Sequence, residues 1–530
     1  MAARPPTNKW LVALSVTFGT LMGTIDSSII NVAIPHLRGS LGATVEEITW
    51  VSTGFIIANV IVMPLTAFFG RFFGQKRVYM ICLGIFVLGS AMCGLARSLP
   101  VLVICRMFQG IGAGALQPTE QAILRQTFPP KEQGMAMALF GVAVVIGPAF
   151  GPTLGGYIVD NYTWPWIFYI NLPIGVLALF MVGTFVHEAD DIRAANQEMA
   201  EKQRKHMDWA GIALLTLGVA TLQYVLEEGQ RDDWFESGLI TTLTAVSIVS
   251  LVAFVIRELT ATVPVVNISL FKDKVFTSGT LIGAVMFAML FSLTFLLPVF
   301  MEEMLGFTAV QSGIALMPRA LTMMVAMPIV GRIYNTVSPR VTVGFGVVLF
   351  SITAYMMSHY TLMTSQSDII GVLILQGVAF ACLFIPLTTV ALSDIPRHKM
   401  ADATGLNSLL RQIGGSVGLA IFATMIPRYT VRAMSSVGAH LTPGRPEVAQ
   451  RLTGITHLFQ SRGYGVNEAT AAAERALGGL VAQQASVLVF EKLFLVAGIA
   501  FLGVLPLLVF LKSPEHGQTD KPKVEVHIEA

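Results

Sequence analysis

Residues 135–159 read MAMALFGVAVVIGPAFGPTLGGYIV. The stretch is apolar throughout, and it has about the length that a helix needs to cross a bilayer. Small residues and prolines recur in it: Gly147, Pro148, Gly151, Pro152, Gly155 and Gly156. Glycines four positions apart share one helix face, where a neighbouring helix can approach backbone to backbone. The prolines remove backbone donors that only surrounding helices can compensate in lipid. The stretch predicts a membrane-spanning helix, either with ordinary glycine packing or with a functional motif.

The composition is that of an integral membrane protein. Of the 530 residues, 54% are hydrophobic and 12% are charged, with a mean hydropathy of +0.69. Soluble proteins carry about twice that share of charged residues. The 34 basic and 32 acidic residues leave a net charge of +2, which gives no case for a nucleic-acid partner. The four cysteines lie in apolar runs without ligand-like spacing, so we expect neither a disulfide nor a metal site.

The chain holds about fourteen apolar stretches of membrane-spanning length. They begin near Trp10, Ile48, Val78, Leu99, Met135, Phe168, Trp209, Gly238, Phe276, Val310, Val341, Ile369, Thr404 and Ser486. An even number of spans puts both termini on the same side of the membrane. Lysine and arginine are concentrated in the loops on that side, which predicts that both termini are cytoplasmic.

Two hydrophilic segments interrupt the spans. Residues 188–208 mix both signs of charge and are expected to form a solvated cytoplasmic linker. Residues 428–485 are expected to form an outer loop before the last span, and their end, EATAAAERALGGLVAQQA, either lies along the membrane or continues that span. The domains expected from these limits are a six-helix bundle at 1–187, an inserted helix pair at 209–257, a second six-helix bundle at 258–512 and a cytoplasmic tail at 513–530.

The two halves of the chain repeat one another. The matches are Met63-Pro64 with Met327-Pro328, Gln109-Gly110 with Gln376-Gly377, and Gly147 and Gly151 with Gly414 and Gly418. The nearly constant offset across corresponding spans indicates a duplicated six-helix unit. Parallel halves of this kind build a transporter that holds its substrate between the halves, near the middle of the membrane.

Ionisable residues within the spans are candidate functional residues, because burying a charge in lipid is costly. Asp26 and Arg106 both lie roughly 10–12 Å below the outer surface, at 1.5 Å per helical residue, so they could form an ion pair. Polar and small residues form a stripe along the fourth span: Arg106, Gln109, Gly110, Ala113, Gln117, Glu120 and Gln121. The stripe is either a packed hydrogen-bonded seam or the lining of a water-filled pathway. The carboxylate of Glu120, with no neutralising neighbour in sequence, favours the pathway.

The second half contributes further ionisable groups. Arg319 and Arg411 are embedded in spans, and Asn407 lies one turn before Arg411. Unpaired cations in a cavity would repel lipophilic cations, so we expect carboxylate or backbone partners for both arginines. Glu302 and Glu303 lie at the outer end of the ninth span.

Several motifs together resemble the fourteen-helix drug:proton antiporters of the major facilitator superfamily, the EmrB/QacA type. The motifs are GPxxGPxxGG from Gly147, DSSIINVAIP from Asp26, RMFQGIGAG from Arg106, WPWIFYINLPIG from Trp164 and MDWAG from Met207. Two positions depart from the family pattern. The loop after the second span has Ala67 and Arg71 where the family usually has glycine and aspartate, which weakens the expectation of a salt-bridge latch there. Glu302 stands where relatives often have glutamine.

The resemblance implies an all-α major facilitator fold and proton-coupled export of hydrophobic, often cationic, drugs from the inner membrane. It implies Asp26 as proton carrier, Arg106 as its modulating partner, Glu120 as a second carboxylate and Glu302 as a further titratable group. The substrate cavity is expected to include Asn31, Gln109, Gln117, Asn407 and Arg411. No catalytic residue, metal or cofactor is expected, since a proton gradient drives the cycle.

The resemblance also implies partners and leaves alternatives. Relatives in double-membraned cells work with a periplasmic adaptor and an outer-membrane channel, which the outer segment 428–485 would contact. A major facilitator importer or exporter of one metabolite is an alternative, although an importer would not need the glycine motif. An integral membrane enzyme is the other alternative, but the spans hold no central histidine to begin a catalytic group.

Overall fold

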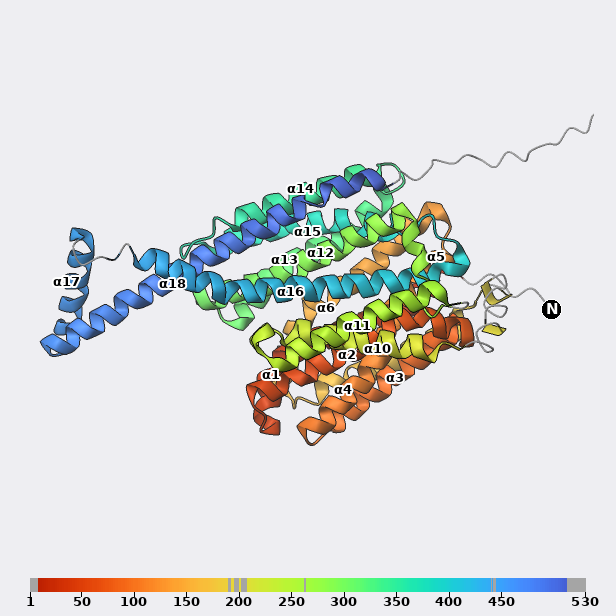
Figure 1. Cartoon of the computed structure of the whole chain (residues 1–530), viewed down its shortest axis with the longest axis horizontal. Helices are drawn as coiled ribbons and strands as arrows, with labels where there is room; N and C mark the ends of the chain where they lie inside the picture. The colour runs from red at the N-terminus through yellow and green to blue at the C-terminus, as the bar shows by residue number, and fades with distance from the viewer. Residues whose placement is uncertain are drawn as a thin grey trace, which may run out of the picture.

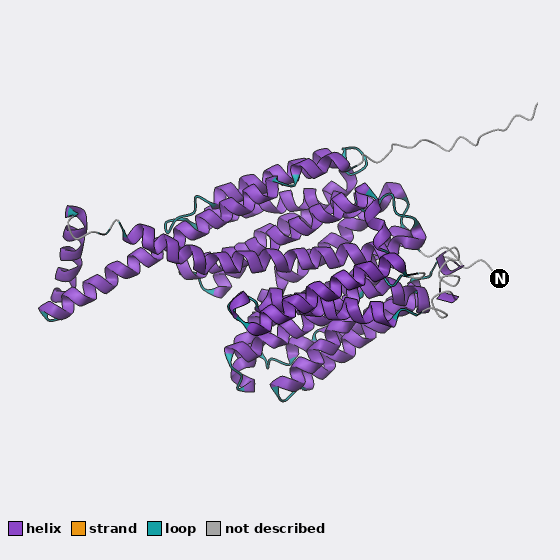
Figure 2. Cartoon of the chain, in the orientation of Figure 1, coloured by secondary structure: helices purple, strands orange, loops and turns teal. Residues whose placement is uncertain are grey.

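The structure is a computed structural model that describes residues 8–188, 192–194, 200–201, 207–261, 264–439, 441 and 445–511. The expected tail at 513–530 lies outside the described residues, as does much of the expected linker. The described part is helical and contains 14 helices long and apolar enough to cross a membrane, which confirms the number expected from hydropathy (Figures 1 and 2).

The first six spans form one group of helices. They are α1 (Lys9–Leu41), α2 (Val45–Phe73), α3 (Gln75–Leu95), α4 (Leu99–Gly114) with α5 (Leu116–Thr127), α6 (Gln133–Asn161), and α7 (Trp166–Tyr169) with α8 (Asn171–Phe185). The inserted pair is α10 (Trp209–Glu228) and α11 (Gly238–Thr260). The fourth span was expected as one helix, but it is interrupted at Ala115, between α4 and α5.

The last six spans form the second group. Their helices are α12 (Lys274–Val299), α13 (Ala309–Ile333), α14 (Pro339–Met357), α15 (Gln366–Val390), α16 (Met400–Gly438) and α18 (Val466–Leu502), with α17 (Pro446–Ser461) before the last. Short helical turns complete the chain at Pro130–Glu132, Trp234–Glu236, Ile268–Lys272, Phe300–Met304, Arg397–Lys399 and Leu505–Phe510.

Local sequence signals and packing both repeat between the halves. The second span of each half, α2 and α13, begins with a capping box, built on Thr44 and on Thr308. Glycines make matching contacts as well: a Cβ at Gly110 would lie 2.5 Å from a carbonyl oxygen of α2, and one at Gly377 would lie 2.6 Å from a carbonyl oxygen of α13. Because equivalent glycines admit equivalent helix contacts, the structure supports the duplication inferred from sequence.

The two groups meet at the end of the molecule where the first and last described residues lie, here called the terminal face (Figure 1). Arg71 of α2 forms an ion pair with Asp402 of α16, 3.0 Å apart. The Asn335 side chain donates to the Lys131 carbonyl, at 2.5 Å. The backbones of α6 and α13 are also close, since a Cβ on Gly134 would lie 2.6 Å from the Gly331 carbonyl oxygen. These contacts close the terminal face.

The outer segment differs from the expected loop. The helix α16 continues to Gly438, α17 occupies Pro446–Ser461, and α18 begins at Val466, well before the apolar start expected near Ser486. The second alternative is therefore right: the helical EATAAAERALGGLVAQQA stretch continues the last span. Figure 1 shows α17 and the first part of α18 projecting beyond the rest of the molecule on the side opposite the terminal face. Hydropathy missed this because the extension is amphipathic rather than apolar.

Candidate functional site

Asp26 lies at the centre of a buried hydrogen-bonded cluster that joins three spans. Its Oδ2 accepts from Arg106 Nη1 at 2.6 Å, and its Oδ1 accepts from Gln109 Nε2 at 2.9 Å and from Asn171 Nδ2 at 2.8 Å. The side chains of Asp26 and Arg106 are each 1% exposed. A carboxylate buried this deeply is held by a direct cation and two neutral donors, which offset the loss of its hydration.

The surroundings of Arg106 fix the guanidinium in place. Its Nε donates to the Val51 carbonyl at 3.1 Å, and Nη1 also donates to Gln109 Oε1 at 2.7 Å. The Phe55 ring centroid lies 4.2 Å from the guanidinium carbon, so the cation also faces an aromatic ring. Arg106 therefore connects α4 to α1 and α2 through one side chain.

Asn171 is a member of this cluster that sequence reasoning did not assign. It begins α8, and its Nδ2 bridges Asp26 Oδ1 and Ser90 Oγ of α3. The signal was available in the WPWIFYINLPIG motif, where Asn171 is a polar residue within an apolar span. Its partner Asp26 lies 145 positions away, and no local pattern connects them.

Glu120 is a second buried carboxylate and lies outside the Asp26 cluster. It is fully buried in α5, and its Oε1 accepts from Thr17 Oγ1 of α1 at 2.9 Å. Its Oε2 has no hydrogen-bond partner, and no ion pair involves Glu120 among the described residues. Nothing in the described surroundings of Glu120 therefore offsets the cost of burying a carboxylate except the Thr17 hydroxyl.

The polar stripe is partly seam and partly pocket lining. Arg106 and Gln109 are fully buried and bonded within the Asp26 cluster, so the water-filled pathway is wrong for this part and the packed seam is right. Gln117 and Gln121, farther along the stripe, line a small pocket between the two halves. The interruption at Ala115 separates these two parts.

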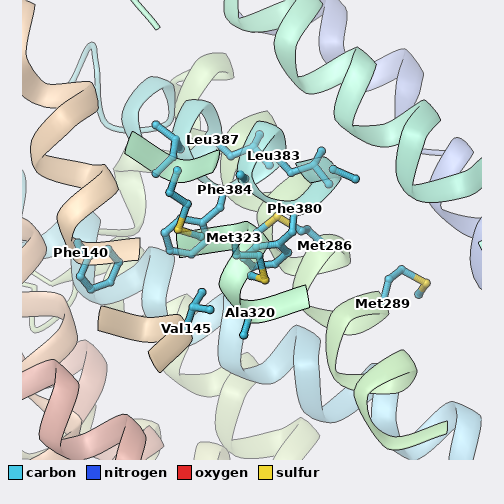
Figure 3. Close-up of a cluster of buried hydrophobic side chains, with 14 of the residues drawn as sticks. Phe140, Val145, Met286, Met289, Ala320, Met323, Phe380, Leu383, Phe384 and Leu387 are labelled. Carbon is cyan, nitrogen blue, oxygen red and sulfur yellow. The ribbon is translucent and has the colours of Figure 1, made fainter. Parts of the chain in front are cut away.

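The pocket between the halves, here called the central pocket, is lined by apolar and polar side chains in equal number. Its lining residues are Met63, Gln117, Gln121, Phe140, Val144, Phe287, Phe384, Ser408, Arg411 and Gln412. Phe140 of α6 and Phe384 of α15 stack across the halves with ring centroids 5.9 Å apart. Figure 3 shows these two rings beside methionine and phenylalanine side chains of the second half. Flexible methionine and flat aromatic surfaces suit a site that accepts varied ligands.

Arg411 is the cation of the central pocket, and the expectation of a carboxylate or backbone partner for it is wrong. The guanidinium carbon lies 5.6 Å from the Phe287 ring centroid and 5.5 Å from that of Phe384. Its Nε and Nη2 are buried and have no hydrogen-bond partner in the described part of the chain. Neighbouring Ser408 Oγ is likewise unpaired. Aromatic faces thus take the place of an acidic partner, leaving donors free for a ligand.

The same expectation is wrong for Arg319. This arginine of α13 donates to Gln376 Oε1 at 3.3 Å and to Thr294 Oγ1 at 3.1 Å, so its partners are a neutral amide and a hydroxyl. It is buried and does not line the central pocket. The shortage of acidic residues in the second half leaves such neutral groups as the available partners.

The other residues expected in the cavity are dispersed. Asn31 is exposed on α1, and Gln109 belongs to the Asp26 cluster, so neither lines the central pocket. Asn407 is fully buried, and both of its side-chain polar atoms are unpaired. Glu302 is exposed in the turn after α12. Their roles in binding or coupling stay predictions.

The glycine motif of α6 packs directly on the part of α1 that carries Asp26. A Cβ at Gly147 would lie 2.4 Å from the Thr24 carbonyl oxygen, and one at Gly151 would lie 2.5 Å from the Ser28 Cβ. Gly155 faces Ile29, with 3.1 Å to its carbonyl oxygen. The motif therefore sets how closely α6 approaches the residues on either side of Asp26.

An inter-half latch exists at Arg71, where the departure from the family pattern had weakened the expectation of one. Arg71 replaces the usual aspartate, yet its Nη1 donates to both carboxylate oxygens of Asp402, and its Nη2 donates to the carbonyls of Pro264 and Val265. Both paired side chains are less than 10% exposed. Asp402 lies in the first turn of α16, where a carboxylate is favoured. No local pattern connects Arg71 with Asp402, which lies 331 positions away.

Comparison with known proteins extends over nearly the whole chain. Residues 16–419 match the family model described as Major Facilitator Superfamily. The multidrug export protein EmrB of Haemophilus influenzae is 34% identical, over 95% of this chain and 96% of its own. The fatty acid resistance protein FarB of Neisseria gonorrhoeae is 32% identical, with the same two coverages.

Solved structures show the same fold. The proton:xylose symporter XylE has a TM-score of 0.60 and 13% sequence identity, covering 95% of this chain and 99% of its own. At that identity the likeness concerns the fold alone. Fold, family model and relatives agree, and the chain is therefore a multi-pass membrane protein of the major facilitator superfamily, a multidrug efflux transporter of the EmrB type.

Proposed function

We propose that this transporter exports hydrophobic compounds in exchange for protons, from an inner membrane in which both termini are cytoplasmic. The observation that carries the proposal is the contact between the Asp26 cluster and the glycine motif. Asp26 lies two positions from Thr24, which contacts Gly147, and two positions from Ser28, which contacts Gly151. A change in the charge of Asp26 would therefore act on the interface between α1 and α6.

The cycle follows from the partners of Asp26. When ionised, Asp26 accepts three hydrogen bonds that tie α1 to α4 and α8. A proton taken up by the carboxylate removes its charge and weakens the bond to Arg106, because a charge-assisted bond becomes a neutral one. Helix α1 is then free to shift against α6. The two halves rock against each other, so that the closed face of the transporter opens and the opposite face closes. In this scheme the terminal face closed by Arg71 and Asp402 is the cytoplasmic face, so the structure represents the outward-facing half of the cycle.

We propose that the central pocket prefers hydrophobic compounds with an acidic group. Arg411 offers unpaired, buried donors there, and such a cation repels cationic ligands and attracts an anionic group. The rings of Phe140, Phe287 and Phe384 provide the apolar surface. A relative is a fatty acid resistance protein, and fatty acids combine a carboxylate with an apolar chain. This differs from the cationic substrates that the sequence motifs alone imply.

Replacing Arg411 by Gln is expected to reduce export of a hydrophobic carboxylic acid far more than export of its neutral amide. A hydrogen bond to a charged group contributes about 1.5–3 kcal/mol, which corresponds to a loss of roughly ten- to a hundredfold for the acid. The measurement is uptake of both compounds into inside-out vesicles. Arg319→Gln is the matched control, because Arg319 is a buried arginine outside the pocket. Equal losses for the two compounds would contradict the preference.

We further propose that the projecting part, α17 with the first turns of α18, contacts a periplasmic adaptor that leads to an outer-membrane channel. Exposed apolar side chains support this: Leu458 is 51% and Leu480 is 46% exposed. No residue of α17 is buried, and the exposed Leu458 leaves apolar surface on this helix that another protein's helix could cover.

Deleting α17 while keeping α18 is expected to reduce export from intact cells to the medium, with transport into inside-out vesicles largely kept. The physical reason is that vesicle transport needs the bundle alone, whereas export across two membranes needs the adaptor. A variant with Leu458 and Leu480 changed to Ser provides a milder test of the same surface. If both assays lose activity equally, the segment serves the transporter's own fold and the adaptor proposal fails.

A further inference from the structure

The outer end of the inserted pair bonds to both halves of the transporter through two consecutive carboxylates. Glu228, at the end of α10, accepts from Thr53 Oγ1 of α2 at 3.2 Å. Glu227, its chain neighbour, accepts from Ser416 Oγ of α16 at 3.4 Å. The inserted helices are thus attached to the first half by one carboxylate and to the second half by the other.

The contact with the second half is a buried polar cluster. Gln223 Nε2 donates both to Glu227 Oε1, at 2.7 Å, and to Ser416 Oγ, at 2.8 Å. Gln223 is fully buried, and its Oε1 has no donor within the described residues. The Trp234 indole, just beyond, donates to Thr424 Oγ1 of α16 at 3.0 Å. The donors that reach Glu227 in this cluster are therefore a neutral amide and a hydroxyl.

The charges around Glu227 leave it unneutralised. Glu228 is the ionisable side chain beside it, and that carboxylate pairs with Arg231 at 2.8 Å, with Asp232 near the same arginine at 3.6 Å. In the described part of the chain, the groups of α2 and α16 that bond to these two carboxylates are the hydroxyls of Thr53 and Ser416. Helix α11 has no ionisable side chain before Arg257, at its far end. On α16 the nearest in sequence are Arg411 and Arg428, and neither pairs with Glu227 in the described structure.

We propose that Glu227 is a further proton-binding residue, whose protonation docks the inserted pair onto α16. In the docked arrangement Glu227 is half-buried, bonded to the neutral groups of Gln223 and Ser416, and beside the Glu228 carboxylate in the chain. Loss of the proton leaves a carboxylate that repels Glu228 and draws in water, so the contact between α10 and α16 loosens. As the halves move, the inserted pair then follows one half or the other according to the pH outside. This inference rests on the proton-coupled export proposed above.

The test follows the distance between the inserted pair and α16 in the full-length protein. Spin labels are placed at the exposed positions Phe235 and Val431, which are 67% and 69% exposed, and distances are measured in lipid nanodiscs at about pH 5 and about pH 8. The wild type is expected to shift to longer distances at the higher pH. Glu227→Gln, which mimics the protonated acid, is expected to keep the short distance at both. Glu236→Gln is the matched control, since Glu236 is an exposed glutamate of the same outer connection.

The outcomes separate this inference from the proposed function. A pH-dependent distance in Glu227→Gln, or a distance independent of pH in the wild type, would overturn it. Asp26→Asn should keep the pH-dependent distance, because Asp26 lies in another cluster. Proton coupling itself is measured separately, as proton flux driven by substrate in proteoliposomes. If the distance responds through Glu227 but no proton flux accompanies transport, the docking switch stands and the coupling proposal fails.

Discussion

Replacing Asp26 by Asn is expected to abolish proton-driven export while leaving the protein folded and inserted. Asparagine keeps the size of the side chain and an oxygen that can accept from Arg106, Gln109 or Asn171. It cannot bind and release a proton, so the change of charge that we propose for this position cannot take place. We expect some loss of stability, below the roughly 3–5 kcal/mol that breaking a buried ion pair typically costs, because the amide oxygen still accepts.

The measurement compares transport driven by an imposed pH gradient in proteoliposomes with counterflow exchange, which needs no gradient. Asp26→Asn is expected to lose the first and to keep part of the second. Asp160→Asn is the control, because Asp160 is a carboxylate near the C-terminal end of α6 with a side chain that is 67% exposed. Export equal to wild type between about pH 6 and about pH 8 would exclude Asp26 as the proton carrier.

Much of the fold could be predicted from the sequence, because the signals are local. Hydropathy located fourteen spans, since each must satisfy its backbone internally within lipid. The glycines of residues 147–155 predicted a close helix contact, and they make one with α1. The helical rise per residue places Asp26 and Arg106 at the same depth in the membrane. Equal depth was enough to predict an ion pair between residues 80 positions apart.

The parts that could not be predicted depend on contacts between distant segments. Asn171 reaches Asp26, and Asp402 reaches Arg71 across 331 positions, without any periodicity that connects them. The aromatic partners of Arg411 belong to two other helices, and aromatic residues are too common in spans to indicate a partner. Glu227 and Glu228 looked like the ordinary charged end of a span. Only packing shows that they face different halves.

Replacing Gly147 by Leu is expected to block transport with the protein still expressed. The glycine leaves no room for a side chain, because a Cβ would lie 2.4 Å from the carbonyl carbon and oxygen of Thr24. A leucine must push α1 and α6 apart next to Asp26, which disturbs both the cluster and the motion between these helices. Gly151→Leu should act in the same way, since its Cβ would meet Ser28 at 2.5 Å. We expect a loss of transport of roughly five- to 150-fold, as overpacking a contact costs about 1–3 kcal/mol.

Gly156→Leu is the matched control for this substitution. It lies in the same helix and motif, but the nearest atom that its Cβ would meet is Val32 Cγ1, at 3.9 Å. We expect it to transport at close to the wild-type rate. Helix α6 also touches the second half, where a Cβ at Gly141 would meet Met327 and Phe384 within 2.9 Å. A side chain at position 147 would therefore separate the segment around Asp26 from the helix that connects it to the second half. Cysteine cross-linking at the terminal face should show that the Gly147→Leu protein stays in one conformation. If Gly147→Leu and Gly151→Leu both transport at the wild-type rate, the motif has no role in transport beyond separating the helices.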